Sequence, residues 1–415
     1  MKKLIFTSII NFLFIFSIFA TQLPSDFLAT QNNTQNEQEV IIEETTKDPF
    51  SVSFGGNFTT NAALTLYEDK SSIFENSENL SIWLKFPLNR NYTSFFACEG
   101  FYDFSLKSAD NQENIILNTL DIPLFKFTFN LNSQNTNSTV NLGRFVITDT
   151  TGFVLNQTMD GVFARFTSTK TDFSLFAGYT GLLNALSTSL FECPYVAEGS
   201  LYALAPSYVV ASASAKFNAF NTQFINTEFI ASVDLNKLDY HKMYATLSLN
   251  GAISQRLYYI LQSTLGMNLK SDGSEDLKIA NLSKFDLTSY FNFLNSSLTL
   301  HGVYASSASD ALDRFKPITR IQASFSGKYY SSLLKTGLLY TFKPASSVFV
   351  SLSSDGICSF DSNSALIFDG IQWALESKWQ IVSDIYLSVA GQQFISLIDE
   401  IQNQFVVALK LGFTF

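Results

Sequence analysis

The last eleven residues of the chain, 405–415, alternate between large apolar side chains and small or polar ones. Successive side chains of an extended strand point to opposite faces, so this stretch would have one wholly apolar face. That face would carry Phe405, Val407, Leu409, Leu411, Phe413 and Phe415, and the other would carry Val406, Ala408, Lys410, Gly412 and Thr414. At the edge of a sheet in water, such a strand would favour aggregation. In a bilayer it can turn its apolar face to lipid and pair both edges within a closed barrel.

The same alternation recurs along the chain, with clusters of Asn, Ser, Asp and Gly between the candidate strands. The clearest examples are residues 122–131, 225–235, 284–293 and 371–380. In each of them, charged or polar residues share the face opposite the aromatic and aliphatic side chains. This arrangement fits lipid outside and water inside better than it fits a dry protein core.

The composition supports the same fold. Hydrophobic residues make up 46% of the chain and 42 residues are phenylalanine. Only 15% of the residues are charged, against about 25% in soluble domains. After residue 20, no window approaches the ~18 uninterrupted apolar residues of a spanning helix. A soluble β-sandwich also alternates, but it normally carries more charge on its outer faces. We therefore predict an all-β fold, a transmembrane antiparallel β-barrel.

An alternating C-terminal strand that ends in phenylalanine resembles the closing strand of bacterial outer-membrane β-barrels. The resemblance covers Phe405–Phe415 and implies that Leu409, Leu411, Phe413 and Phe415 act as the C-terminal assembly signal. It also implies a location in the outer membrane. The expected partners are outer-membrane lipids and the barrel assembly machinery, and a homo-oligomer is compatible with it.

The N-terminus predicts export. Lys2 and Lys3 precede an apolar run from Leu4 to Ala20, which is the form of a secretory signal peptide, residues 1–20. An N-terminal membrane anchor is the alternative, but the run is short and interrupted by polar residues. Residues 21–49 are polar and then acidic, without a sustained period, and predict a flexible periplasmic tail. The barrel would then occupy residues 50–415.

Nineteen segments qualify as candidate strands, among them 138–147, 160–168 and 317–329. Bacterial single-chain barrels have an even number of strands, so one candidate must be spurious, split or missing. We predict about eighteen strands, with sixteen to twenty open. The sequence does not assign individual loops to one side of the membrane.

Two irregular segments are candidates for a constriction of the pore. Residues 181–206 are too long for a tight turn and form either an external loop or a segment folded into the barrel. Residues 148–160 follow Gly143 and Arg144 and contain Asp149 and Gly152. This second region resembles porins, in which a Gly-Arg strand leads into an Asp- and Gly-bearing loop that narrows the pore.

Charged residues on the faces opposite the aromatics are the candidate pore-lining groups. Opposite charges across a pore can orient water and bias the passage of ions. The basic candidates are Lys126, Arg144, Arg165, Arg320, Lys378 and Lys410, and the acidic candidates are Glu99, Asp103, Glu228, Asp234, Asp286 and Glu376. Arg144 and Arg165 flank the expected constriction and are the strongest of these. Alternatively, each residue is simply solvated in the lumen without a selective role.

Covalent chemistry is disfavoured by the sequence. The chain has only two histidines, His241 and His301, and no residue pattern identifies the group that would orient a catalytic base. Phosphate-binding, zinc-protease and EF-hand motifs are absent, so we expect no cofactor and no metal. Cys98, Cys193 and Cys358 could form one disulfide, but isolated thiols are favoured. The net charge of −10 argues against nucleic acid as a partner.

These features predict a porin-like channel for passive diffusion of small hydrophilic solutes, without enzymatic activity. The alternative is a barrel scaffold whose extracellular loops bind host or other extracellular ligands, as an adhesin does, with little conductance. The sequence does not identify the solute.

Overall fold

A computed structural model describes residues 51–89, 93–110, 113–133, 136–191, 200–220, 222–236, 241–269, 279–309, 312–360, 364–398 and 402–415. The predicted signal peptide and tail lie outside these residues and remain predictions. Within the described part, eighteen strands and one short 3₁₀ helix succeed one another. The strands are β1 (Ser53–Tyr67), β2 (Ser72–Pro87), β3 (Ser94–Ala109), β4 (Ile115–Asn132), β5 (Thr136–Thr148), β6 (Asn156–Ser168), β7 (Thr171–Tyr179), β8 (Tyr208–Phe220), β9 (Gln223–Asp234), β10 (His241–Ser254), β11 (Leu257–Leu269), β12 (Ile279–Phe291), β13 (Ser296–Ala305), β14 (Leu333–Ala345), β15 (Val348–Phe360), β16 (Leu366–Val382), β17 (Ile385–Ser396) and β18 (Gln404–Thr414); the helix is η1 (Phe293–Asn295).

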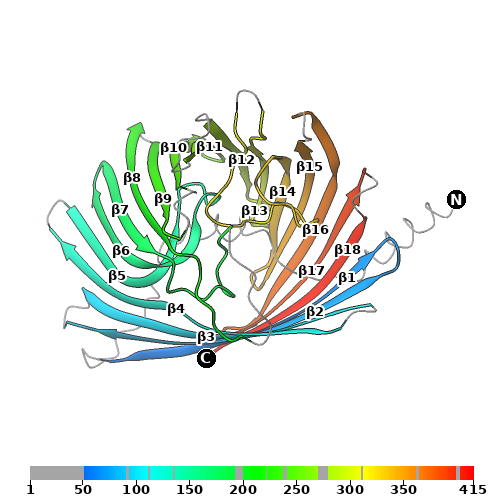
Figure 1. Ribbon diagram of the computed structural model, residues 1–415, viewed down its shortest axis with the longest axis horizontal. Helices are drawn as coiled ribbons and strands as arrows, with labels where there is room; N and C mark the ends of the chain where they lie inside the picture. Colours follow the sequence, from blue (N-terminus) through cyan, green and yellow to red (C-terminus); the bar gives the residue numbers. More distant parts are fainter. Residues whose placement is uncertain are drawn as a thin grey trace.

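The strands form one closed antiparallel barrel in which each strand pairs with its neighbours in the chain (Figure 1). The barrel closes where β1 pairs with β18, from Asn57 opposite Thr414 to Tyr67 opposite Gln404. Beyond the end of β18, the backbone of Phe415 exchanges two further hydrogen bonds with Gly56. The predicted barrel and its strand number are thus confirmed. Among the described residues, no helix is long and apolar enough to cross a membrane.

The spurious candidate among the nineteen is 317–329, which belongs to the connection between β13 and β14. Its alternation has a different cause from that of the strands. Ile318, Ile321 and Ala323 are buried at 4%, 3% and 0% exposure because the segment packs against other residues inside the barrel. A second difference concerns β6, which begins at Asn156 rather than after Asp160, so the segment between β5 and β6 is only 149–155.

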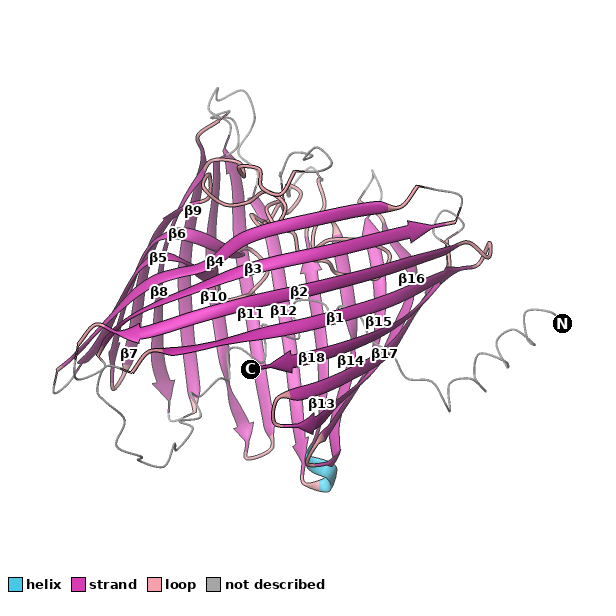
Figure 2. Cartoon of the chain, turned by 90° about the horizontal axis from the view of Figure 1, so that it is seen from below, coloured by secondary structure: helices cyan, strands magenta, loops and turns pink. Residues whose placement is uncertain are grey.

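With that candidate removed, the long and short connections separate by side. The long ones, 149–155, 180–207, 270–278, 306–332 and 397–403, each join an odd-numbered strand to the next even-numbered one. The others are short, such as 169–170 between β6 and β7 and 383–384 between β16 and β17. Figure 2 shows described loops gathered at the upper end of the barrel and η1 at the lower end. We call these the long-loop end and the short-turn end; in outer-membrane barrels the long loops are extracellular and the short turns periplasmic.

The outer surface of the barrel is apolar, as the alternation predicts. On β18, Leu409, Leu411 and Phe413 are 43%, 41% and 42% exposed, whereas Ala408, on the opposite face of the strand, is 2% exposed. Large apolar side chains also project outward near the short-turn end, where Phe54 and Phe220 are 77% and 78% exposed. Such a surface is stable only in an apolar solvent, so the barrel presents a lipid-facing wall.

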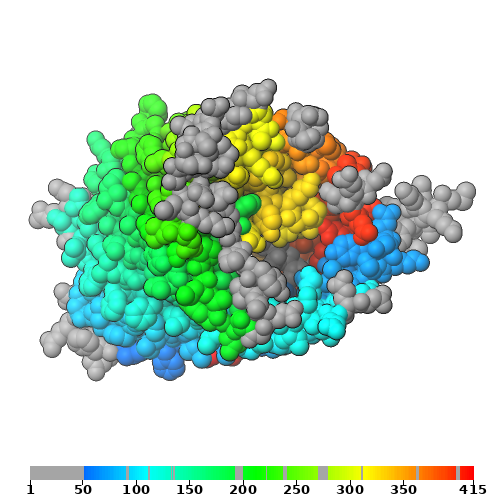
Figure 3. All heavy atoms as spheres, viewed as in Figure 1, coloured from blue at the N-terminus to red at the C-terminus, as the bar shows by residue number. Residues whose placement is uncertain are grey.

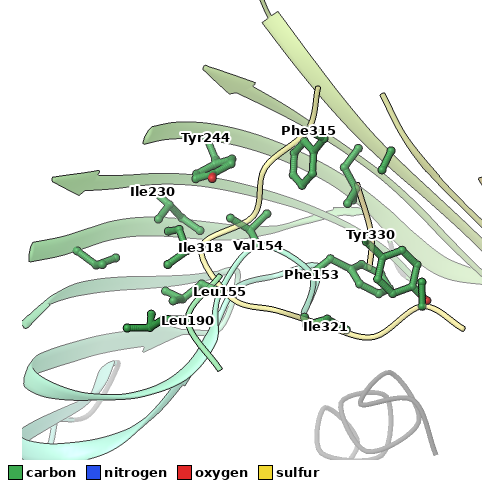
Figure 4. Close-up of a cluster of buried hydrophobic side chains, with 14 of the residues drawn as sticks. Phe153, Val154, Leu155, Leu190, Ile230, Tyr244, Phe315, Ile318, Ile321 and Tyr330 are labelled. Carbon is green, nitrogen blue, oxygen red and sulfur yellow. The ribbon is translucent and has the colours of Figure 1, made fainter. Parts of the chain in front are cut away.

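The hydrophobic core of the protein lies inside the barrel (Figure 4). The described parts of three connections fold inward and pack against lumen-facing side chains of the wall. They are 149–155 of the β5–β6 connection, 180–191 and 200–207 of the β7–β8 connection, and 306–309 and 312–332 of the β13–β14 connection. Their fully buried members include Val154, Leu190 and Phe315. All wall residues of this core belong to strands β5–β17, apart from the partly buried Leu124 of β4.

Candidate functional site

The β5–β6 connection folds around the carboxylate of Asp149, which is 3% exposed. Its Oδ1 accepts hydrogen bonds from the backbone N–H groups of Val154 (3.1 Å) and Leu155 (2.8 Å). Its Oδ2 accepts from the backbone N–H and the hydroxyl of Thr151. Gly152 supplies the left-handed backbone conformation (φ 75°) that lets the segment turn back on itself. Burial raises the pKa of the Asp149 carboxyl, although these hydrogen bonds act in the opposite direction.

The same connection reaches across part of the lumen to strands β9, β11 and β12. The backbone N–H of Thr150 donates to Glu228 Oε2 of β9 at 2.6 Å, and Gln262 Nε2 of β11 donates to the Thr150 carbonyl at 2.9 Å. Phe153 lies under the ammonium group of Lys284 on β12, 5.1 Å from the ring centre. The connection is therefore a crossbeam, fixed at β5 and β6 on one side and at β9, β11 and β12 on the other.

The β13–β14 connection is hydrogen-bonded to this crossbeam. The N–H groups of Ile318 and Thr319 both donate to the Val154 carbonyl, at 2.9 and 3.2 Å. The β7–β8 connection joins the same network, because Phe191 N donates to the Ile318 carbonyl and Arg320 N donates to Ser189 O. The three inward connections thus form one hydrogen-bonded body. In Figure 3, the yellow 306–332 segment and the green end of the β7–β8 connection cover much of the face at the long-loop end.

The tip of the β13–β14 connection is a small hairpin tied to β16. Lys328 Nζ lies 2.6 Å from Asp369 Oδ2, and the Asp369 side chain is fully buried. The Ser359 hydroxyl donates to the other oxygen of Asp369 at 2.7 Å. The N–H of Phe325 adds a longer hydrogen bond, 3.3 Å, to Gln372 Oε1. One ion pair therefore provides the main polar attachment of this hairpin to the wall.

A row of polar residues crosses the lumen face from β12 to β16. In register, Asp286 lies opposite His301, His301 opposite Gly337, Gly337 opposite Asp355, and Asp355 opposite Gln372. His301 Nε2 is 2.7 Å from Asp355 Oδ1, so this contact spans β14 above Gly337. A Cβ atom at Gly337 would lie 2.1 Å from that same oxygen. Glycine is thus required there for the two side chains to meet.

Lys335 adds an ammonium group beside this row, 3.5 Å from Asp355 Oδ2. His301 faces the lumen, as its shared face with Thr299 predicts, but its ring is engaged by a carboxylate. Within the described part of the chain, no serine or threonine hydroxyl is hydrogen-bonded to that ring, and no cluster of residues is arranged to hold a metal ion. The row places polar and charged side chains along the lumen face of the wall.

Arg144 occupies a branch point in the wall. The pairing of β4 with β5 ends at Phe125 opposite Arg144, whereas β4 continues to pair with β3 as far as Ile115. The Arg144 guanidinium makes two 2.8 Å hydrogen bonds to Asp160 of β6 and lies 3.5 Å from Asp121 of β4. It also donates to the Leu182 carbonyl of the β7–β8 connection. The Arg144 side chain is only 13% exposed, so its charge is committed to these contacts.

The β7–β8 connection lies along the edge of β4 that β5 leaves free. Asn184, which is fully buried, donates from Nδ2 to the carbonyls of Leu120 on β4 and Leu201 within the connection, both at 3.0 Å. The N–H of Leu120 donates to the Leu201 carbonyl. The side chain of Asn184 therefore replaces part of the missing strand pairing. Of the two alternatives for residues 181–206, the part outside 192–199 is folded into the barrel.

Arg144 lies opposite Phe125 and shares a face of β5 with Val146, which are 47% and 60% exposed, so it does not lie on the lumen face that was predicted for it. Other predicted pore residues are distributed along the lumen. Glu228 is 6% exposed beneath the crossbeam, and Asp234 is 3% exposed near the long-loop end of β9. Arg165 forms its ion pair with Asp172 near the β6–β7 turn, away from the crossbeam that it was expected to flank. Arg320 lies on the β13–β14 connection and donates from Nε to the Phe191 carbonyl.

The remaining predicted residues take lumen-facing positions on the wall. Glu376 and Lys378 lie on β16, where Glu376 accepts from the Ser388 hydroxyl and Lys378 lies over the Tyr386 ring. By register with residues of known face, Glu99, Asp103 and Lys126 also face the lumen. A role of any of these residues in selectivity remains a prediction. Cys98 and Cys358 are free thiols, while Cys193 lies outside the described residues.

Sequence reasoning missed several residues of the site, among them Gln262, Lys328, Asp355 and Asp369. Asp369 and Asp355 lie among the alternating residues of β15 and β16, so only three-dimensional contact distinguishes them from other lumen residues. Lys328 was placed in a strand that does not exist. Asp149, in contrast, was inside the segment expected to narrow the pore.

The fold is shared with solved outer-membrane proteins of Pseudomonas aeruginosa. The chain matches the outer membrane protein opdK with a TM-score of 0.57 at 9% identity, over 88% of this chain and 99% of that chain. For OccK11 (OpdR) the TM-score is 0.58 at 10% identity, over 88% and 96%. For OpdQ it is 0.57 at 11% identity, over 88% and 99%. No protein-family model and no curated protein sequence matches the chain. What the chain shares with these proteins is therefore their fold, a closed barrel of the outer-membrane type.

Proposed function

We propose that this protein is an outer-membrane channel through which small hydrophilic solutes diffuse passively. The proposal rests on the combination of a lipid-facing wall and a polar lumen. Three hydrogen-bonded connections narrow this lumen, but the hydrophobic core that they form leaves β1–β3 and β18 uncovered. A pore that conducts needs water-filled space, and a pore that selects needs fixed polar groups at its narrow part. The crossbeam and the row from Asp286 to Gln372 supply such groups.

The channel is proposed to act without covalent chemistry. The similar solved structures are outer-membrane proteins, and one of them is described as OpdK with vanillate. Small organic anions therefore belong in a first panel of test solutes, beside neutral sugars and inorganic ions. The solute itself is left to that panel.

Reconstitution of the folded full-length protein into planar bilayers tests the proposal. We expect discrete, reproducible conductance steps, and liposomes containing the protein should swell in isotonic solutions of small hydrophilic solutes but not of large ones. A second variant, Gln262→Ala, removes one hydrogen bond that holds the crossbeam. It should alter the conductance without abolishing it. Folded protein that gives neither steps nor swelling would exclude the channel and leave the ligand-binding scaffold.

Assembly and partners complete the proposal. The chain is proposed to be exported by residues 1–20, to lie in the outer membrane in contact with its lipids, and to be inserted by the barrel assembly machinery. Leu409, Leu411 and Phe413 project from β18 toward lipid, which leaves them accessible to a recognition factor before closure. Cross-linking of intact cells would reveal whether the barrel also forms homo-oligomers.

A further inference from the structure

The outer wall of the barrel contains a groove that extends over β10–β14. Its volume is about 440 Å³. The large side chains that line it are Leu247, Leu249, Leu261, Phe285, Tyr304 and Leu334. Three small residues lie among them and leave the space open: Ser263, Ser283 and Gly302. We call this space the wall groove.

The alternation of the strands places the wall groove on the lipid-facing side of the barrel. On β11, Leu261 and Leu265 are exposed, and Ser263 lies between them on the same face. Ser263 is directly opposite Leu247 of β10 and Ser283 of β12. Directly opposite residues of neighbouring strands share a face of the sheet, so the groove opens to lipid and not to the lumen.

A cluster of three uncharged polar residues lies at the long-loop end of the wall groove: Ser263, Asn281 and Ser283. Asn281 Nδ2 donates to Ser263 Oγ at 3.1 Å, and the Ser283 hydroxyl donates to Asn281 Oδ1 at 2.8 Å. Ser263 is exposed, and no acceptor for its hydroxyl proton occurs among the described residues. Hydrocarbon offers no water to such a group, so an acceptor supplied by a lipid would stabilise it.

The height of this polar cluster matches that of the acyl linkages of a lipid. β12 begins near the long-loop end and finishes at the exposed Phe291 near the short-turn end. Asn281 precedes Phe291 by ten residues. In a strand tilted by about 40°, this separation spans about 25 Å of the membrane, which is the usual height of the apolar band. The cluster therefore lies at the outer edge of the band, where acyl chains join their headgroups.

The chemistry of the wall groove selects an uncharged group. Lys284 and Gln262 also border it, but their side chains point into the lumen, where they contact Phe153 and Thr150. A volume of 440 Å³ suits a small ligand, since such sites occupy about 300–1,000 Å³. A stable interface between two proteins buries about 1,200–2,000 Å², which a groove of this size does not supply. One lipid chain therefore fits it better than a second barrel.

We propose that the wall groove binds one lipid of the outer leaflet. One acyl chain lies in the groove, and the carbonyl of its ester or amide linkage accepts a hydrogen bond from the Ser263 hydroxyl. The groove is continuous with the lipid-facing wall, so the lipid enters it directly from the bilayer. The bound chain packs on the outside of β11 and β12, which hold the crossbeam on their lumen side through Gln262 and Lys284.

Native mass spectrometry of the folded full chain in detergent tests this binding. The probes are dimyristoyl phosphatidylcholine and its ether-linked counterpart, which has chains of the same length but lacks the two carbonyls. We expect one ester lipid to be retained by each barrel. The ether lipid should bind about fivefold more weakly, because it cannot accept the hydrogen bond. Replacing choline by glycerol in the ester lipid should change little, because no charged group of the protein faces the groove.

Two variants and a matched control locate the lipid. A Cβ atom at Gly302 has its nearest neighbours at 3.8 Å, so Gly302→Leu can fill the groove and should weaken retention about tenfold. Gly100→Leu is the control, because Gly100 lies opposite the exposed Ile82 on the lipid-facing side of β3, and a Cβ there meets nothing within 4 Å. It should retain the lipid. Ser263→Ala should remove the difference between the ester and ether lipids.

Three outcomes overturn the proposal. The first is that Gly302→Leu retains the lipid as strongly as Gly100→Leu, and the second is that ester and ether lipids bind equally to the unaltered protein. The third is a dimer that Gly302→Leu separates without a change in lipid retention, because the groove would then receive a second copy of the chain. A heat-dependent shift on gels checks the folding of each variant. The comparison of the two lipids needs no variant, so it decides even if Gly302→Leu does not fold.

Discussion

The ion pair between Lys328 and Asp369 gives the sharpest test of how the lumen is kept narrow. Substituting Lys328→Met keeps an unbranched side chain of similar length but removes its ammonium group. Among the described residues, the fully buried Asp369 carboxylate then has the Ser359 hydroxyl as its remaining partner. Removing one partner of a buried ion pair costs about 3–5 kcal/mol. Because the Lys328 side chain is 27% exposed, the lower end of that range applies. A cost of about 3 kcal/mol corresponds to a shift of about 150-fold in the ratio of docked to undocked hairpin.

Two assays would detect that shift. Undocking moves the hairpin at Ser324–Gly327 away from β16, so the single-channel current should become larger on average and noisier. In a background without native cysteines, Ser326→Cys should react with a water-soluble thiol reagent faster when Lys328 is replaced. Adding Asp369→Asn to Lys328→Met removes the uncompensated charge and should restore most of the docking.

The matched control is Lys316→Met on the same connection, because Lys316 forms no ion pair within the described residues. Its current noise and labelling rate should equal those of the unaltered protein. The reasoning fails if Lys328→Met behaves like Lys316→Met. It also fails if Asp369→Asn loosens the hairpin further in the Lys328→Met background, since the carboxylate would then be a stabilising partner of something other than Lys328.

Three other outcomes are expected. Since burial raises the pKa of Asp149, protonation favours the folded crossbeam, so current noise should be lowest in acid and should grow as pH rises through that pKa; Asp149→Asn should reduce this trend. Gly337→Ala places a Cβ 2.1 Å from Asp355 Oδ1 and should destabilise the barrel by about 1–3 kcal/mol in urea unfolding, whereas Gly302→Ala, whose nearest neighbours are 3.8 Å away, should cost far less. Arg144→Met leaves the carboxylates of Asp160 and Asp121 without their cation and should destabilise the barrel by about 3 kcal/mol. Adding Asp160→Asn should recover part of that loss, and equal stability of the single and double variants would contradict the assignment.

Much of the barrel could be predicted because its wall obeys a local rule. Period-two alternation depends on each residue and its neighbours, so Phe405–Phe415 predicts its own outward and inward faces. Part of the segment 317–329 follows the same rule for another reason: Ile321 and Ala323 are buried against the interior of the barrel, whereas Arg320 and Gln322 are exposed. From the sequence, only the requirement for an even number of strands could have shown that one of the nineteen candidates is not a strand.

The site was less predictable, because contacts across the lumen join residues far apart in the chain. Thr150 and Gln262 meet over more than a hundred residues, and Lys328 meets Asp369 from a segment that was expected to be a strand. Arg144 shows a further limit. Its place on a strand suggested a solvated pore cation, but the early end of β4–β5 pairing places it between two carboxylates.

The position of the core inside the barrel implies two separate sources of stability. The wall is held by backbone hydrogen bonds in a setting where lipid offers no substitute partner, whereas the side chains around Val154, Leu190 and Phe315 cluster because they avoid water. Agents that weaken hydrophobic burial reach the core inside the barrel through the lumen, without first breaking the hydrogen bonds of the wall. The width of the pore can therefore respond to conditions that leave the wall of the barrel intact.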